Sequence, residues 1–295
     1  LLSRDGRRSE LIVDVHNGIP FCAPLVRRRG VNVLVHHVHR EQWKIIYPGS
    51  IGRAGWWVES SLTPRLYRRQ RYITVSESTK HDLGLLGVAP DRVAVICNGI
   101  DVPHPSMLGR RSATPRLCVL GRIVPHKQFD HALRVLSALG PSYAELSLDV
   151  IGDGWWIEHL QRSAEELGVS DRVNFHGHVP DAERDRILDE SWLMLAPSVK
   201  EGWGIAIMEA AAHGLPTLAY SSAGGVTESI LDGETGVLVD DLDDLIVQTR
   251  LLLDDHEART IMGKKARERA GHFGWERSAA AFERHLLGAD AQRLP

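Results

Sequence analysis

The sequence has few cysteines, no long apolar run and little net charge. Cys22, Cys97 and Cys118 are dispersed and lack CxxC spacing, which argues against a disulfide framework or a zinc knuckle and favours a reducing cytosol. No apolar run approaches the roughly 18 residues that a membrane-spanning helix needs. The formal net charge is −3 over 295 residues. We therefore expect a globular, cytoplasmic protein, whose length suggests two domains.

The small net charge conceals an uneven distribution. Residues 1–110 carry 16 Lys and Arg against 9 Asp and Glu, whereas the remainder carries 19 against 29. A solvated basic surface explains the first part most simply. The alternative is a face for anionic lipid headgroups or a phosphorylated acceptor, with Trp56 and Trp57 at the interface, and it predicts peripheral contact with the cytoplasmic side of a membrane. No nucleic-acid-binding motif accompanies the charge, so we expect no nucleic acid partner.

Hydrophobic periodicity divides the chain at a Pro-rich break. Strands are predicted near residues 11–15, 31–37, 72–76 and 93–97, and the break at 102–115 is the expected linker. Beyond it, strand and helix patterns alternate, which argues for a parallel sheet covered on both faces. The later strands are expected near 116–120, 146–151, 173–175, 192–196, 217–220 and 236–239, and the helices near 129–139, 156–167, 182–189, 205–213, 226–231, 243–253, 256–270 and 275–287.

The loops that follow the later strands are rich in glycine and charge. Ligands of open α/β sheets bind beyond the carboxyl ends of the strands. These loops therefore outline one candidate site; they are residues 121–127, 152–154, 176–180, 198–204 and 221–225.

The stretch 198–216 combines a strand end, a glycine turn and a helix. Glu201 lies in the turn and Glu209 lies eight residues later, inside the predicted helix. Turn glycines let backbone N–H groups approach a ligand, and a helix N-terminus favours an anion. The helix N-terminus would bind a phosphate, and the carboxylate would bind hydroxyls of the same ligand. This combination suggests a phosphorylated sugar or a nucleotide. Two solvated glutamates on an ordinary turn and helix would explain the residues equally well.

Two cations follow the first strand of the second part. Arg122 and Lys127 stand five residues apart across a turn that contains proline. A diphosphate needs cations at separate oxygens, and Arg supplies a planar fork while Lys supplies a point charge. Solvated surface cations are the simpler alternative.

Three further strings allow a metal or turn interpretation. His37 and His39 would share a strand face, but no third or fourth metal ligand is apparent, so core histidines are the simpler explanation. Asp241 and Asp243 form a D-x-D string beside a helix start, where N-capping explains them. Asn98-Gly99 is predicted to be a turn with positive φ.

The string E-G-W-G-I-x-x-M-E-A-x-A-x-G-x-P, from Glu201 to Pro216, resembles the donor-site signature of the GT-B glycosyltransferases of family 4 (glycosyl transferases group 1). Arg122 and Lys127 fit the G-R-x-x-x-x-K element of that family, and the resemblance extends from about residue 11 to 287. It implies two Rossmann-like domains that face each other across a cleft. Their expected bounds are 1–105 for an acceptor-side domain, 106–115 for the linker, 116–274 for the nucleotide-sugar domain and 275–295 for a helix that packs back on the first domain.

The resemblance also implies roles for individual residues. Arg122 and Lys127 would neutralise the diphosphate, Glu201 would bind donor-sugar hydroxyls, and Glu209 would bind the ribose diol. A histidine of the first domain, His37 or secondly His39, would point at the transferred sugar. The catalytic set is then Arg122, Lys127, Glu201 and His37, and the donor site comprises Gly121, Arg122, Lys127, Gly152, Val179, Glu201, Gly202, Trp203, Gly204, Ile205, Ala206 and Glu209.

The implied reaction is a retaining transfer from a nucleotide-diphosphate sugar to a hydroxyl of an acceptor sugar, glycan or glycolipid. Neither a metal nor another cofactor is expected. Two other functions stay open: a phosphorylase or epimerase that uses the same pocket, and a non-catalytic subunit that binds a nucleotide sugar.

Members of the family that this sequence resembles begin with several βα units. The first strand of this sequence looks like the fourth strand of those proteins, so the earlier units are not found here. The first domain is therefore expected to be incomplete. An incomplete parallel sheet leaves strand edges and apolar faces uncovered. We expect either an oligomer or a separate chain that completes this domain.

Overall fold

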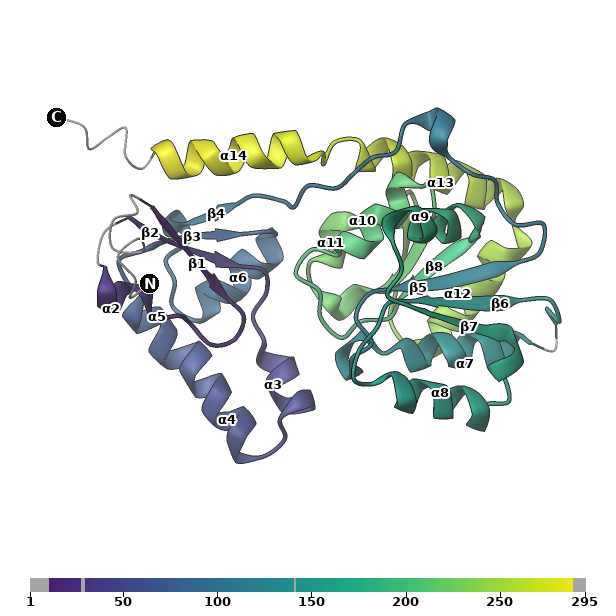
Figure 1. Ribbon diagram of the computed structural model, residues 1–295, viewed down its shortest axis with the longest axis horizontal. Helices are drawn as coiled ribbons and strands as arrows, with labels where there is room; N and C mark the ends of the chain where they lie inside the picture. The colour runs from purple at the N-terminus through teal and green to yellow at the C-terminus, as the bar shows by residue number, and fades with distance from the viewer. Residues whose placement is uncertain (1–10, 28–29, 141, 289–295) are drawn as a thin grey trace. The chain divides into compact units, whose positions relative to one another are not determined.

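The computed structural model describes residues 11–27, 30–140 and 142–288. The chain divides into two compact units, one formed by residues 1–99 and 275–295 and the other by residues 100–274. Each unit holds its own parallel sheet, so the prediction of two parallel α/β domains is confirmed (Figure 1). None of the helices in the described ranges is long and apolar enough to cross a membrane.

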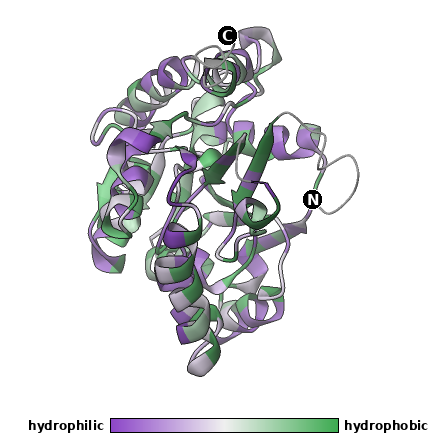
Figure 2. Cartoon of the chain, turned by 90° about the vertical axis from the view of Figure 1, so that its left-hand side faces the viewer, coloured by the Kyte–Doolittle hydropathy of each residue, from purple (hydrophilic) through white to green (hydrophobic). Residues whose placement is uncertain are grey.

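The first unit contains a four-stranded sheet in the order β1-β2-β3-β4. Its strands are mainly hydrophobic (Figure 2), as expected of parallel strands. The predicted strand 31–37 is too long, since β2 ends at Val35 and the following histidines lie in a loop. The bounds are β1 Ile12–His16, β2 Val31–Val35, β3 Arg71–Thr74 and β4 Val93–Val95.

The helices of the first unit before residue 99 were not predicted. The buried carboxylate of Glu59 in η1 ties this part to α3, because it accepts hydrogen bonds from the His39 N–H at 3.0 Å and from Trp43 Nε1 at 2.6 Å. Gly55 lets α4 approach α3, because a Cβ there would lie 2.4 Å from the Trp43 ring. The helices are α2 Ala23–Val26, α3 Arg40–Ile46, α4 Ser50–Trp57, the π-helix η1 Val58–Leu62, α5 Thr63–Leu66 and α6 Glu77–Leu85.

The last helix, α14 (Trp275–Gly288), belongs to the first unit, where Ser278 donates a hydrogen bond to the Cys97 carbonyl at 2.5 Å. The expected positive φ at Asn98-Gly99 is wrong, because neither residue adopts it. Gly99 is needed for a different reason. A Cβ there would lie 2.5 Å from the Trp275 indole.

The second unit contains a six-stranded parallel sheet in the order β10-β9-β8-β5-β6-β7. The predicted alternation of strands and helices is confirmed here, with ends that differ by one or two residues. The strands are β5 Arg116–Leu120, β6 Ser147–Ile151, β7 Val173–Gly177, β8 Leu193–Ala196, β9 Thr217–Tyr220 and β10 Gly236–Val239. The helices are α7 Phe129–Leu139, α8 Ile157–Glu166, α9 Asp181–Glu190, α10 Ile205–Ala212, α11 Val226–Ser229, α12 Leu242–Asp254 and α13 His256–Ala270.

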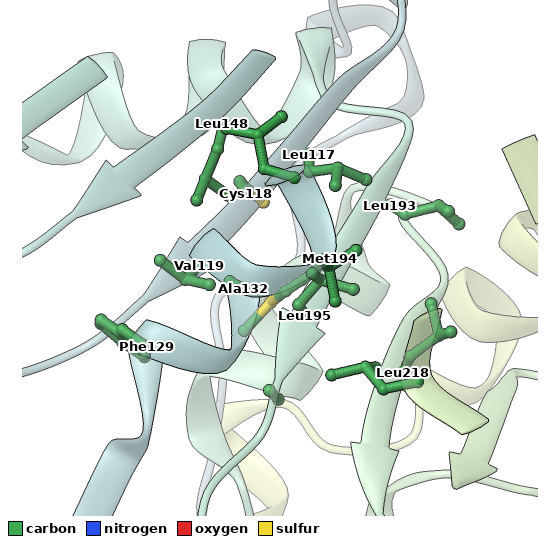
Figure 3. Packing of buried hydrophobic residues seen from close by; sticks show 14 of the residues in the cluster. Leu117, Cys118, Val119, Phe129, Ala132, Leu148, Leu193, Met194, Leu195 and Leu218 are labelled. Carbon is green, nitrogen blue, oxygen red and sulfur yellow. The ribbon is translucent and has the colours of Figure 1, made fainter. Parts of the chain in front are cut away.

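The central strands of this unit are fully buried. Leu117 and Val119 of β5 pack with Leu195 of β8 and with Phe129 of α7 (Figure 3). This rigid centre holds the loops that follow β5, β6 and β8. After the edge strand β10, Asp241 caps α12 by accepting a hydrogen bond from the Asp244 N–H, so the N-cap interpretation of the D-x-D string is confirmed.

Candidate functional site

Two glycine loops meet at the carboxyl ends of β5 and β6. The Gly121 N–H donates to the Ile151 carbonyl at 3.0 Å, and the Ile123 N–H donates to the Asp153 carbonyl at 2.9 Å. Gly152 has φ of 129°, and a Cβ there would lie 2.0 Å from the Gly121 carbonyl oxygen. Only glycine fits such a contact. The two loops therefore form one closely packed backbone edge beside the strand ends.

Lys127 and Glu201 form an ion pair at this edge. Lys127 ends a short 3-10 turn after β5 (Pro125–Lys127), and its Nζ lies 2.5 Å from Glu201 Oε1. The same carboxylate oxygen accepts a hydrogen bond of 2.6 Å from the Ser198 hydroxyl. The Lys127 and Glu201 side chains are 18% and 15% exposed, so the pair is largely shielded but still reaches solvent. The structure thus brings together a predicted diphosphate ligand and a predicted sugar ligand.

The backbone holds Glu201 independently of its side chain. Its N–H donates to the Ala223 carbonyl at 2.8 Å, and its carbonyl accepts from the Gly225 N–H at 3.1 Å. A Cβ on Gly225 would lie 2.0 Å from the Gly202 carbonyl oxygen, which explains the glycine there. The turn before α10 is therefore fixed by the loop after β9.

The helix α10 begins directly after the turn that contains Glu201. Gly204 adopts φ of 90° at the N-cap, and no side chain caps the helix within the described chain. Ile205 is exposed and Ala206 is half-buried. The first-turn N–H groups of α10 are consequently available to an anion, as expected at the start of a helix.

Glu209 lies one turn further along α10, and its partner was not predicted. Arg184 of α9 places Nη1 3.6 Å from Glu209 Oε1 and 2.9 Å from Asp181 Oδ1. Its Nε and Nη2 both donate to Asp185 Oδ1, at 3.0 and 2.8 Å. Burial raises the pKa of Glu209, and the charge of Arg184 acts against that rise. Arg184 is the main functional candidate that the sequence analysis missed.

Polar contacts continue from Arg184 to the C-terminal end of α10. His213, just after this helix, lies with Nε2 3.5 Å from Asp185 Oδ1 and with Nδ1 2.8 Å from Asp189 Oδ1. Asp189 also accepts from the Gly109 N–H at 2.7 Å. These contacts join α9 to Glu209 inside α10 and to His213 just after it, so they hold Glu209 in place relative to α9.

Three predicted donor residues have other surroundings. Arg122 is exposed and forms no ion pair with any residue that the structure describes. Val179 is half-buried against the core of the second unit. The Trp203 side chain is 2% exposed and packs edge-to-face on Phe273, with centroids 5.1 Å apart. Only the backbone of Trp203 can therefore line a site.

His37 lies in the first unit, in the loop after β2. Its ring forms a hydrogen bond with the Gln42 side chain at 3.1 Å and contacts the His39 ring, with centroids 4.2 Å apart and ring planes tilted by 41°. The His39 Nδ1 lies 3.0 Å from Glu59 Oε1. Among the described residues, no group of three or more His, Cys, Asp or Glu side chains could hold a metal ion.

Comparison with solved structures identifies the fold. The chain is similar to the solved structure of Thermosynechococcus elongatus sucrose-phosphate synthase, with a TM-score of 0.79 at 19% identity. It is also similar to the crystal structure of Anabaena HepE in complex with UDP and glucose, with a TM-score of 0.75 at 20% identity. The matches cover 95% and 90% of this chain and 74% of each of those chains. The two parallel-sheet units have the GT-B fold of glycosyltransferases.

Family profiles define the relationship more narrowly. The profile described as "Glycosyl transferases group 1" matches residues 105–269, more than half of the chain, and that of "Glycosyltransferase Family 4" matches residues 8–103. The chain belongs to the glycosyl transferases of group 1. The D-inositol 3-phosphate glycosyltransferase of Corynebacterium diphtheriae is 35% identical over 225 residues, which is 70% of this chain and 52% of that relative. The chain thus spans about half the length of this curated relative.

Proposed function

We propose that the protein transfers a sugar from a nucleotide-diphosphate sugar to an acceptor hydroxyl, with retention of configuration and without a metal. The observation that carries the proposal is the Lys127–Glu201 pair beside the uncapped N-terminus of α10. A cation and a carboxylate in contact, next to free N–H groups of a helix N-terminus, match a ligand with both phosphates and hydroxyls. HepE, of the same fold, was crystallised with UDP and glucose, which supports a ligand of this kind.

Negative charge gathers on the diphosphate as the glycosidic bond breaks. Fixed positive groups at that place lower the barrier, because they need no reorganisation during the reaction. Lys127, Arg122 and the N–H groups of Gly204 to Ala206 would supply this charge. The exposed Arg122 has no competing carboxylate among the described residues, so it can turn toward the phosphates at little cost.

The two glutamates would bind different parts of the donor. Glu201 would accept hydrogen bonds from the donor-sugar hydroxyls, while Lys127 shifts from Glu201 to a phosphate oxygen. Glu209 would hold the ribose diol, a role that carboxylates fill in other nucleotide sites. Gly121, Gly152 and Gly202 would admit the ligand to the backbone, and Val179 would contact the base.

The acceptor is proposed to be a sugar, a glycan or a glycolipid. One relative, from Corynebacterium diphtheriae, acts on D-inositol 3-phosphate according to its name, which supports a polyol acceptor. His37 is the proposed contact to the transferred sugar. We assign no general base, because the leaving phosphate itself can take the acceptor proton.

A thermal-shift panel of UDP-, GDP-, ADP- and dTDP-sugars tests the donor assignment, since a ligand that binds the folded state raises the melting temperature by mass action. The stabilising sugar is then incubated with a panel of polyol and glycan acceptors, with and without EDTA. Transfer in the presence of EDTA supports the proposal. Stabilisation by none of the nucleotide sugars would contradict it, and conversion of the donor without an acceptor would identify an epimerase instead.

A further inference from the structure

A helical arm in the first unit has a charge and hydropathy pattern that the proposed reaction does not use. We define the arm as residues 40–70, which comprise α3, α4, η1 and α5. It contains six Lys and Arg against two Glu. Of the two acids, Glu59 is buried and bonded to Trp43 and His39, and Glu41 is half-buried. The exposed surface of the arm is therefore cationic.

The outer side of α4 is apolar. Ile51 and Trp57 are 67% and 58% exposed, and Leu62 of η1 continues the row at 41%. Ala54, also exposed, lies between Ile51 and Trp57 at helical spacing. The inner side is already filled, since a Cβ on Gly52 would lie 2.0 Å from the Tyr47 carbonyl oxygen and Gly55 touches the Trp43 ring. The apolar row thus has no packing role within its own unit.

Unpaired cations flank this row. Arg53 and Arg65 are exposed on α4 and α5, and Lys44, Arg68 and Arg69 are exposed nearby. Within the residues that the structure describes, none of the five forms an ion pair. Arg65 donates instead to the backbone carbonyl of Ser61. Five exposed cations without a carboxylate partner among the described residues, beside an exposed apolar row, form a surface that matches an anionic partner with an apolar interior.

We propose that the arm docks on an anionic membrane surface, with α4 parallel to the surface and Trp57 at the headgroup boundary. An amphipathic helix with tryptophan on one side and arginine on its borders binds at this level, and the cations attract anionic lipid. A protein partner would need a carboxylate opposite each arginine at a fixed position. A bilayer needs only negative charge and accessible acyl chains, which the loose spacing of these cations suits better.

Vesicle flotation tests the proposal on the 295-residue chain. Binding is measured to phosphatidylcholine vesicles and to vesicles that also contain about one third phosphatidylglycerol, because the anionic surface attracts basic segments. Each assay is run at about 0.1 M and about 0.5 M salt, since salt screens exposed charges. We expect binding to the anionic vesicles only, and weaker binding at the higher salt concentration.

Two paired variants divide the effect into charge and apolar contact. Arg53→Gln with Arg65→Gln should weaken binding about 25-fold, or about five-fold for each charge near an anionic surface. Ile51→Ser with Trp57→Ser should reduce binding below detection. The matched controls are Lys264→Gln and Ile261→Ser on α13, whose side chains are also exposed. They should bind as the unaltered chain does, and all variants should keep its melting temperature.

Two results would overturn the docking proposal. One is binding that neither paired variant reduces. The other is absence of vesicle binding together with a concentration-dependent dimer that the Ile51→Ser, Trp57→Ser variant abolishes in sedimentation velocity, which would assign the row to a second copy of the chain. Nucleotide-sugar binding measured without vesicles should be unchanged in every variant. A failure of the docking proposal is thereby distinguished from a failure of the proposed glycosyl transfer.

Discussion

Arg184 on α9 lies 3.6 Å from the carboxylate of Glu209 on α10 and is the cation nearest to it among the described residues. Burial raises the pKa of Glu209, Arg184 lowers it, and Asp185 and Asp181 raise it again. If the ionised carboxylate holds the ribose diol, nucleotide affinity should fall as the pH falls through this raised pKa. Arg184→Gln should move that fall to a higher pH, because the opposing positive charge is gone.

Calorimetry with the nucleoside diphosphate from pH 5 to pH 8, at steps of about half a unit, measures this shift. Arg186→Gln is the matched control on the same helix, since Arg186 pairs with Glu183 and Glu190 and not with Glu209. Its profile should match that of the unaltered chain. Equal profiles for all three proteins would show that Arg184 does not act through Glu209.

Arg122→Ala and Lys127→Ala should each lower kcat/KM by roughly 100-fold, the loss expected for one preorganised charge-stabilising group. Their stabilities should differ. Arg122 is exposed, so its removal should leave the melting temperature unchanged. Removal of Lys127 should lower the melting temperature, because it leaves the largely shielded Glu201 with Ser198 as its remaining side-chain partner. Circular dichroism melts and steady-state kinetics provide both measurements. Near-normal turnover in either variant would remove that residue from the diphosphate site.

The ends of the strands in the second unit could be predicted from sequence, but the contacts across them could not. Lys127 and Glu201 are far apart in the chain and meet because β5 and β8 pair in the centre of the sheet. Hydrophobic periodicity identifies each strand and says nothing of which strand lies beside it. The Arg184–Glu209 contact was missed for the same reason, since it depends on how α9 packs beside α10.

The first unit was harder to predict because its helices are held by single buried groups. The segment around α3 and α4 depends on Glu59 and on the fit of Gly55 against Trp43, neither of which produces a clear repeat in the sequence.

In the second unit, the position of Trp203 in the sequence suggested a role that its side chain does not have. An aromatic residue in a glycine turn suggests a ligand contact, yet its side chain is buried against Phe273.

Glu209→Gln should weaken binding of the nucleoside diphosphate itself. Glu201→Gln should weaken binding of the nucleotide sugar and spare the nucleoside diphosphate. The reason is their separation along the turn and helix: Glu201 lies beside Lys127, and Glu209 lies beside Arg184. Calorimetry with both ligands on both variants measures the division, with the exposed Glu268 of α13 changed to Gln as a control. The same pattern for both variants would contradict separate roles.

His16 at the end of β1 should make the first unit sensitive to acid. Burial lowers its pKa from 6.5 to about 4, while the nearby carboxylates of Asp14 and Glu59 act in the opposite direction. Between these two pKa values the unfolded chain binds a proton that the folded chain does not, so the free energy of unfolding rises with pH. The contribution of His16 to the free energy of unfolding is complete above pH 6.5 and is lost progressively toward pH 4. The loss amounts to about 1.4 kcal/mol for each pH unit at most.

Hydrogen exchange of the β1 to β3 amides, measured from about pH 4 to about pH 7, tests this linkage in the first unit itself. Exchange rates corrected for intrinsic pH dependence should show weaker protection in acid. His16→Gln removes the ionisable group from both states and should flatten the pH dependence, even if it lowers stability at pH 7. His81→Gln on α6 changes an exposed histidine of the same unit and should leave the dependence as it was. An unchanged slope in His16→Gln would show that His16 is not the source of the acid sensitivity.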